Sequence, residues 1–297
     1  MRSSSPTSNE SDLCSRVLPV PPVNRAELVV AILAGIVQGI VEWLPVSSQG
    51  NLSLFLTVAG TDPANAVQLA LFLQVGTTLS ATLYYRDDIA TALRAVPGWR
   101  PGTAYSGENA IPSYVVVASV MTGVVGIPLY LTAVDLAGRV SGGVFIALIG
   151  VLLVLTGFLQ LVSESVSMGG RDAPTLLDSI LVGAVQGVAI LPGISRSGTT
   201  TSALLFRSYD PPAAFRLSFL LSIPASLGAA ALTVAEAGGL PGISPGAALV
   251  ALGVSSVVGY WTIDALMRVV DRVPFWAVCF GLGGLAIVGG GIVSALV

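Results

Sequence analysis

Long apolar runs alternate with short polar connections along most of the chain. Six of these runs are each about 20 residues long, the length that an α-helix needs to cross a bilayer core of about 30 Å. They cover residues 66–85, 113–134, 142–162, 213–235, 245–266 and 274–296. The pattern therefore predicts an all-α polytopic membrane protein with six transmembrane helices.

Two further apolar regions, 26–59 and 176–207, are each interrupted by Pro, Ser and Gly. The second half of each region has only about 12 residues, too few to cross a bilayer. Irregular backbone is tolerated at membrane depth only where it is buried in protein or lines a wet cavity. We therefore expect two re-entrant helical hairpins; a kinked spanning helix is the alternative for each region.

The two interrupted regions resemble each other. GIVQGIVEWLPVSSQGN (35–51) and GAVQGVAILPGISRSGT (183–199) share a Gly-x-x-Gln-Gly opening, a proline, and a serine three residues after that proline. FLQVGTTLSA (72–81) also resembles FLLSIPASLGA (219–229). A duplicated unit is indicated, and because three crossings separate its copies, they must be inserted in opposite orientations. The sequence thus predicts an inverted-topology repeat.

The apolar pattern begins only after an N-terminal segment. Residues 1–25 are rich in Ser, Pro and Asn and contain no apolar run, so we expect a disordered tail. The rest is expected to form one membrane domain, residues 26–297. Its predicted repeats span about 26–162 and about 176–297.

Arginine is unevenly distributed between the connections. Short cytoplasmic connections carry the excess of positive charge in membrane proteins. Outside the tail, only Arg139 falls on one side. The opposite side carries Arg86, Arg94, Arg100, Arg171, Arg207, Arg216, Arg268 and Arg272. We therefore expect a multi-pass protein of the cell membrane with both termini outside.

Composition excludes several functions. The chain is 54% hydrophobic and only 10% charged, well below the charged fraction of soluble domains. Its net charge is −3, all 13 basic residues are arginine, and no basic stripe is present, which excludes nucleic-acid binding. It contains no histidine, so histidine-based triads and zinc sites are excluded as well.

Two ionisable residues stand out within the interrupted regions. Ionisable groups at membrane depth are costly and mark functional sites by default. Glu42 lies in the first region and Arg196 at the break of the second. If the breaks meet near the middle of the membrane, both side chains share one cavity. The alternative is a purely structural salt bridge between the repeats.

The residues around Arg196 favour an anion site. The segment PGISRSGTTTS (192–202) places six hydroxyls in eight positions at the start of a short helix. Free backbone N–H groups, the helix dipole, hydroxyl donors and a guanidinium together indicate an oxyanion site, most naturally for phosphate. Gln38 lies one helical turn before Glu42 and shares its face. The expected binding residues are Gln38, Ser47, Asn51, Ser195, Ser197, Thr199 and Thr200.

EWLPVSSQGN (42–51) and PGISRSGTT (192–200) resemble the two signature motifs of the bacitracin-resistance family of undecaprenyl pyrophosphate phosphatases. The resemblance runs from about residue 26 to the C-terminus. It implies a membrane enzyme that removes one phosphate from a polyprenyl diphosphate and so recycles a lipid carrier. It also implies six spanning helices and two re-entrant pairs. The matching active-site positions are Glu42, Ser48, Ser195, Arg196 and Thr200.

Two positions depart from that family's pattern. Gln38 stands where the family has a glutamate, and Asn51 stands where it has a histidine. Both replacements keep hydrogen-bonding capacity but remove proton-transfer capacity. Glu42 then remains as the acid or base of the predicted site.

Two functional hypotheses follow. In the enzyme, Glu42, Ser48 and Arg196 are catalytic: Ser48 or water attacks the terminal phosphorus, Glu42 orients or deprotonates the nucleophile, and Arg196 stabilises the developing charge. Glu42 would also hold a divalent cation, Mg²⁺ or Ca²⁺, together with substrate phosphates. The partners would be a polyprenyl diphosphate and membrane lipids, with a homodimer left open. The alternative is a polyprenyl-phosphate transporter (flippase) of the same fold, because inverted repeats with broken helices are typical of carriers.

Overall fold

The computed structural model describes residues 24–166, 169–171, 173–269 and 274–296, and the described residues are almost entirely helical. The predicted tail therefore lies, apart from its last residues, outside the described part. The helices are α1 (Arg25–Val41), α2 (Ser48–Val58), α3 (Pro63–Tyr84), α4 (Arg86–Ala95), α5 (Ala110–Arg139), α6 (Gly142–Val166), α7 (Leu176–Val188), α8 (Arg196–Phe206), α9 (Pro211–Glu236), α10 (Pro245–Val269) and α11 (Phe275–Leu296).

Six of the described helices, α3, α5, α6, α9, α10 and α11, are long and apolar enough to cross a membrane. They match the six predicted segments to within a few residues at each end. Their outward side chains are apolar, for example Val116, Leu249 and Val288, each more than 60% exposed. An exposed apolar surface of this kind is suited to lipid. The chain is thus an all-α multi-pass membrane protein.

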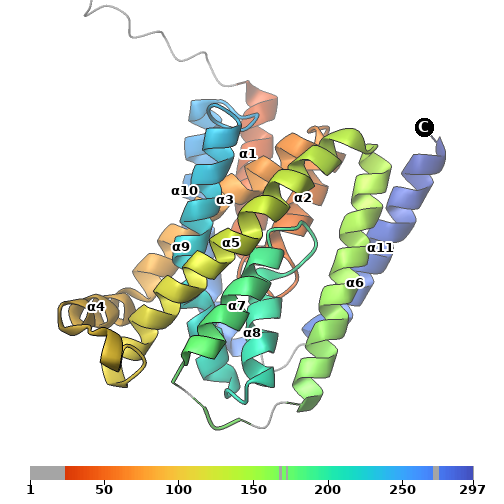
Figure 1. The fold of residues 1–297 in the computed structure, drawn as a ribbon. Coiled ribbons are helices and arrows are strands. Elements are labelled where there is room, and N and C mark those ends of the chain that lie inside the picture. Colours follow the sequence, from red (N-terminus) through yellow and green to blue (C-terminus); the bar gives the residue numbers. More distant parts are fainter. Residues whose placement is uncertain (1–23, 167–168, 172, 270–273, 297) are drawn as a thin grey trace, which may run out of the picture.

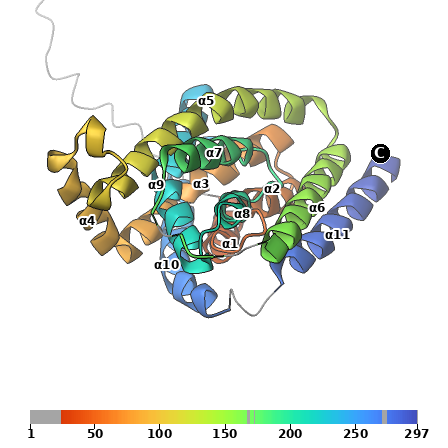
Figure 2. The same cartoon turned by 60° about the horizontal axis from the view of Figure 1, so that its bottom comes forward.

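The two interrupted regions form helix pairs, α1 with α2 and α7 with α8. The first pair turns back on itself, since Ala31 and Ala34 of α1 share a buried cluster with Leu52 and Leu56 of α2. Figure 1 shows the α1–α2 pair entering the bundle from the upper end and the α7–α8 pair from the lower end. Seen from below, α1 and α8 lie at the centre, surrounded by longer helices (Figure 2). The re-entrant placement of the pairs in a bilayer and the inverted repeat stay predictions.

The glycines of the repeated motif are points of close helix contact. An added Cβ at Gly35 or Gly39 of α1 would lie 2.7 Å from an atom of α10. At Gly183 and Gly187 of α7, it would lie 2.4 and 2.7 Å from an atom of α5. Small residues spaced by four let helices approach closely where packing, not the hydrophobic effect, drives association in membranes. The duplicated glycines therefore explain why α1 and α7 each lie against one long helix.

A charged cluster at the start of α7 ties together the open end of the second pair. Asp178 is fully buried, and its Oδ1 accepts a hydrogen bond from Arg207 Nε at 2.6 Å. Its Oδ2 accepts from Arg171 Nη2 at 3.0 Å, Thr175 Oγ1 at 2.6 Å and the Tyr209 hydroxyl at 2.8 Å. Burial by itself raises the pKa of Asp178, but these hydrogen bonds outweigh it and hold the pKa below its ordinary value.

Candidate active site

The breaks of the two helix pairs are in contact, with side chains of the first hydrogen-bonded to the backbone of the second. The N–H of Gly193 donates to Ser47 Oγ at 3.2 Å, and Gln49 Nε2 donates to the carbonyl oxygen of Ile190 at 2.9 Å. An added Cβ at Gly50 would lie only 2.6 Å from the backbone nitrogen of Gly193. No side chain larger than hydrogen fits between the two breaks at this point. The contact therefore fixes how the residues of one break face those of the other.

Two helices begin at this contact, α2 at Ser48 and α8 at Arg196. Ser47 caps α2 by accepting from the N–H of Gly50 at 3.2 Å. Ser195 caps α8 by accepting from the N–H of Gly198 at 3.1 Å. Each cap satisfies one first-turn N–H and leaves others without an intrahelical acceptor. Two positive dipole ends thus converge on one place, an arrangement that favours an anion.

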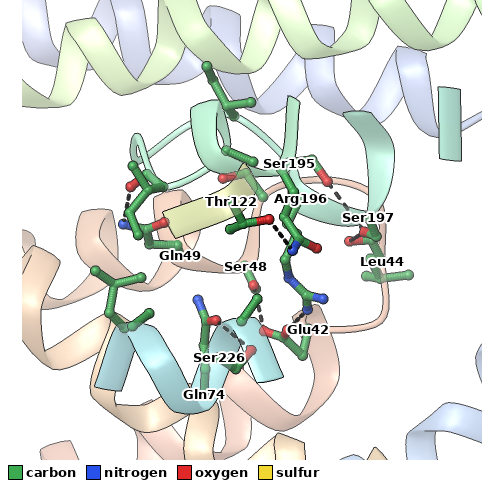
Figure 3. A pocket seen from close by; sticks show the side chains of 18 residues that line it. Glu42, Leu44, Ser48, Gln49, Gln74, Thr122, Ser195, Arg196, Ser197 and Ser226 are labelled. Atoms are coloured by element: carbon green, nitrogen blue, oxygen red, sulfur yellow. Dashed lines mark hydrogen bonds and ion pairs between the residues drawn. The ribbon is translucent and has the colours of Figure 1, made fainter. Parts of the chain in front are cut away.

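Glu42 and Arg196 meet at the same place, as the sequence predicted for breaks that touch. Glu42, directly after α1, is 4% exposed, and its Oε1 is paired with Arg196 Nη2. Its Oε2 accepts from Gln38 Nε2 and from Ser48 Oγ, each at 2.7 Å. The second terminal nitrogen of Arg196, Nη1, is buried and has no partner among the described residues. Figure 3 shows the carboxylate and the guanidinium pointing toward each other, with Ser48 beside them.

These groups line a cavity that is open to the outside. The predicted site residues that line it are Glu42, Ser47, Ser48, Ser195, Arg196 and Ser197. Gln38 lies behind Glu42, fully buried, and reaches the cavity only through its hydrogen bond to that carboxylate. The structure therefore brings together the groups from both motifs that phosphate binding and proton transfer require.

Three predicted binding residues have their polar groups engaged elsewhere. Asn51 Nδ2 donates to the carbonyl oxygens of Val46 and Ser47, at 2.7 and 3.0 Å, and so supports the first break. Thr199 Oγ1 donates to the Ser195 carbonyl and Thr200 Oγ1 to the Arg196 carbonyl, each at 2.8 Å. Threonine hydroxyls inside helices commonly bond the carbonyl four residues earlier. The cavity lining does not include Asn51, Thr199 or Thr200, contrary to the position expected for ligand contacts.

The cavity also contains polar groups that the sequence interpretation missed. Gln186 Nε2 donates to Thr122 Oγ1 at 3.0 Å, while Gln186 Oε1 is buried with no partner in the described part of the chain. On the opposite wall Ser226 Oγ donates to Gln74 Oε1 at 3.2 Å (Figure 3). The sequence did contain a signal for Gln186, because this residue occupies the same place in the second motif as Gln38 does in the first.

The groups that could hold a cation are few. Among the described residues that line the cavity, Glu42 supplies the only carboxylate. Within the described ranges, no three His, Cys, Asp or Glu side chains are close enough to form a metal site by themselves. Gln38 Oε1 is buried and accepts no hydrogen bond from any described group. Hard cations prefer oxygen ligands, and in the described lining the Glu42 carboxylate is the group suited to one.

The chain is similar in sequence to known proteins over most of its length. The sequence model of the family described as "Bacitracin resistance protein BacA" matches residues 31–285. A protein named undecaprenyl-diphosphatase from Haloarcula marismortui is 49% identical over 270 residues, which cover 90% of this chain and 98% of that protein. Proteins of the same name from Methanococcoides burtonii and Methanopyrus kandleri are 40% and 37% identical, covering 86% and 89% of this chain and 96% and 97% of their own length.

Proposed function

The chain belongs to the BacA family of bacitracin resistance proteins, and on that premise we propose that it hydrolyses an undecaprenyl-type polyprenyl diphosphate to the lipid monophosphate and inorganic phosphate. It is a membrane phosphatase that recycles a lipid carrier. One observation carries the mechanism. A serine hydroxyl donates to a buried carboxylate in the same cavity as an arginine nitrogen that has no described partner.

The diphosphate would bind where α2 and α8 begin. The free first-turn N–H groups and the positive dipole ends of both helices together favour negative charge. Arg196 would contact a phosphate oxygen through Nη1 while Nη2 stays on Glu42. A guanidinium shared between carboxylate and phosphate is held in one orientation, so it stabilises charge developing on the transferred group without reorganising.

Ser48 is positioned as the nucleophile. Its Oγ already donates to Glu42 Oε2 at 2.7 Å, which is the geometry required of a general base and its proton donor. Attack on the terminal phosphorus would form the Ser48–phosphate bond, break the bridging P–O bond and release the lipid monophosphate. The Ser48 proton would pass to Glu42 and from there to the departing lipid monophosphate. Water would then attack the phosphoserine, with Glu42 taking a proton from that water and returning it to Ser48 Oγ as the bond between serine and phosphorus breaks.

The residues present fit a divalent cation, Mg²⁺ or Ca²⁺, that enzyme and substrate would bind together. Glu42 would hold it together with phosphate oxygens, since Mg²⁺ ordinarily takes one or two carboxylates, substrate phosphates and water. When bound, it would neutralise charge on the phosphoryl group. The amide of Gln38 also donates to Glu42, so part of the charge stabilisation comes from the chain itself.

The hydrogen bond between Ser48 and Glu42 favours hydrolysis over transport, because a carrier needs an anion site but no activated nucleophile. The direct test uses the purified full chain with a polyprenyl diphosphate and Mg²⁺. We expect equal amounts of inorganic phosphate and lipid monophosphate. Protein that binds the lipid and moves polyprenyl phosphate across vesicles, yet releases no phosphate, would establish the carrier instead.

We further infer that the protein lies in the cell membrane with both termini outside. Figure 1 shows the start of α1 and the end of α11 at one end of the bundle and α4 at the other. The α4 end carries Arg86 and Arg94, and Arg216 joins it through a 2.6 Å ion pair with Asp88. Positive charge marks the cytoplasmic side. Tags at residues 2 and 297 should be accessible in intact cells and a tag within 94–108 should not; the reverse pattern would contradict this topology.

A further inference from the structure

A second hollow lies beside the polar cavity, between α5 and α9. Four residues, Thr122, Ile190, Ala225 and Ala229, line both spaces, so the two are directly adjacent. From this junction the hollow follows α5 from Ser119 to Ile127, a rise of about 12 Å along the helix. We refer to it as the α5–α9 groove.

The described lining of the α5–α9 groove is mostly apolar and contains no aromatic side chain. Beyond Ser119 and Thr122, its described lining consists of Gly, Ala, Pro, Ile and Leu. An added Cβ at Gly228 would meet no described atom within 4 Å, and one at Gly123 would touch only a side-chain carbon at 3.9 Å. Glycine costs stability inside a helix, yet here the missing side chains leave the space open. The groove can therefore accept an occupant without any rearrangement of the backbone.

The flanks of the groove face outward and are apolar. Val120 and Val124 of α5 are 60% and 62% exposed, and Leu227 of α9 is 49% exposed. Such side chains on two spanning helices are suited to lipid. The groove thus joins a site for a charged phosphate group to the apolar outer face of the bundle. A ligand with an anionic head and a long hydrocarbon tail has this same distribution of polarity.

We propose that the α5–α9 groove binds the first isoprene units of the polyprenyl chain, those next to the diphosphate. The inference rests on the proposed function and deepens it by assigning the path of the tail. Another hollow, among α6, α7 and α8, shares only Ile194 with the polar cavity. The α5–α9 groove shares four residues, which makes it the apolar hollow with the more extensive contact to the diphosphate site.

The first test measures binding and does not depend on hydrolysis. The purified full chain is photolysed with a polyprenyl monophosphate that carries a diazirine on its first isoprene unit, and labelled peptides are identified by mass spectrometry. We expect the label on 119–127 of α5 and 224–232 of α9. Label concentrated on 155–159 of α6 and 185–188 of α7, or spread evenly over the outer helices, would overturn the proposal.

The second test fills the groove. Gly228→Trp should raise KM for a polyprenyl diphosphate at least about tenfold with kcat little changed, because loss of apolar contacts of even methylene size costs that much. Gly281→Trp is the matched control: Gly281 is an exposed glycine of α11 whose added Cβ also meets no described atom within 4 Å. Inorganic pyrophosphate, which has no tail, should inhibit Gly228→Trp and wild type equally.

These tests separate the groove from the reaction. An unchanged KM for Gly228→Trp, or an equal rise for Gly281→Trp, would contradict the assignment of the groove. Weaker inhibition by pyrophosphate would contradict it too, because the substitution would then have disturbed the anion site. Wild-type protein that releases no phosphate but is labelled at α5 and α9 would contradict the proposed hydrolysis and still support the assignment of the groove.

Discussion

Arg196 contributes geometry as well as charge. Nη2 is paired with Glu42 while Nη1 is left for a ligand, and a lysine has a single ammonium that cannot occupy both positions. We therefore expect Arg196→Lys to lose activity nearly as severely as Arg196→Ala, about 10²-fold or more. Phosphate release is the measurement, and Arg139→Lys, at an exposed surface ion pair, is the control. A lysine variant within about threefold of wild type would show that charge alone suffices.

Gln38 and Asn51 stand where the resemblance found in the sequence implied a glutamate and a histidine. A carboxylate in place of the Gln38 amide, now 2.7 Å from Glu42, would repel Glu42 unless a cation lay between them. Gln38→Glu combined with Asn51→His should therefore raise the rate about tenfold or more in Mg²⁺ and make it depend more steeply on Mg²⁺ concentration. Rates are measured against Mg²⁺, with both single variants as controls. An unchanged rate and Mg²⁺ profile would mean that the site is organised around amides.

At the residue scale, the sequence showed which charged residues stand out but not where each polar side chain points. Glu42 and Arg196 could be identified because ionisable groups are rare in apolar segments. The direction of Thr199 and Thr200 could not, since an isolated motif does not show that their hydroxyls bond the helix carbonyls. Gln74 and Ser226 were missed because single polar residues on long apolar helices do not show which cavity they face.

At the scale of elements, the contact between the breaks depends on a glycine inside α2. Replacing a helical glycine by alanine ordinarily stabilises a protein. At Gly50, however, the new Cβ would lie 2.6 Å from the backbone of Gly193. Gly50→Ala should therefore push the breaks apart and lower phosphate release by about tenfold or more, because small misplacements of reacting groups are costly.

The control for that variant is Gly253→Ala on α10, where an added Cβ meets no described atom within 4 Å. It should retain full activity, since nothing obstructs the new methyl group. Both variants are compared for phosphate release after their thermal stability in detergent has been recorded. A Gly50→Ala protein as active as Gly253→Ala would show that the contact between the breaks does not position the site.

The cluster around Asp178 gives the second helix pair a pH dependence. The pKa of this carboxyl is held below its ordinary value, so its contribution to stability is complete above the ordinary pKa of about 3.9 and is lost as pH falls through the lowered value. Asp178→Asn should cost about 1–3 kcal/mol at pH 7, with the deficit shrinking only below about pH 4. Denaturation in detergent against pH measures this.

Asp135→Asn is the matched control, because its ion pair with Arg139 is exposed and such pairs contribute little. A deficit for Asp178→Asn that was the same at every pH would contradict the assigned role of the charge.

Periodicity predicted the six long helices well, because length and apolarity define a span. It did not predict α4, a charged helix without a buried residue, which no apolar pattern reveals.

At the scale of the whole molecule, the site exists only where two distant parts of the chain meet. The repeated motif suggested that the breaks correspond, but a sequence does not show that the Gly193 amide bonds Ser47 or that α2 and α8 begin side by side. That arrangement follows from packing of α1 on α10 and of α7 on α5 through the duplicated glycines. The α5–α9 groove likewise arises only from tertiary packing.

The central claim is that Glu42 activates a nucleophile for attack on the terminal phosphorus. It is tested by hydrolysis of a polyprenyl diphosphate in H₂¹⁸O by purified wild type and Glu42→Gln, with Glu108→Gln, an exposed glutamate, as control. We predict that wild type and Glu108→Gln release inorganic phosphate carrying ¹⁸O and leave the lipid monophosphate unlabelled. Glu42→Gln should bind the lipid but release about 10²- to 10⁴-fold less phosphate. Undiminished release by Glu42→Gln, or ¹⁸O in the lipid monophosphate, would contradict the claim.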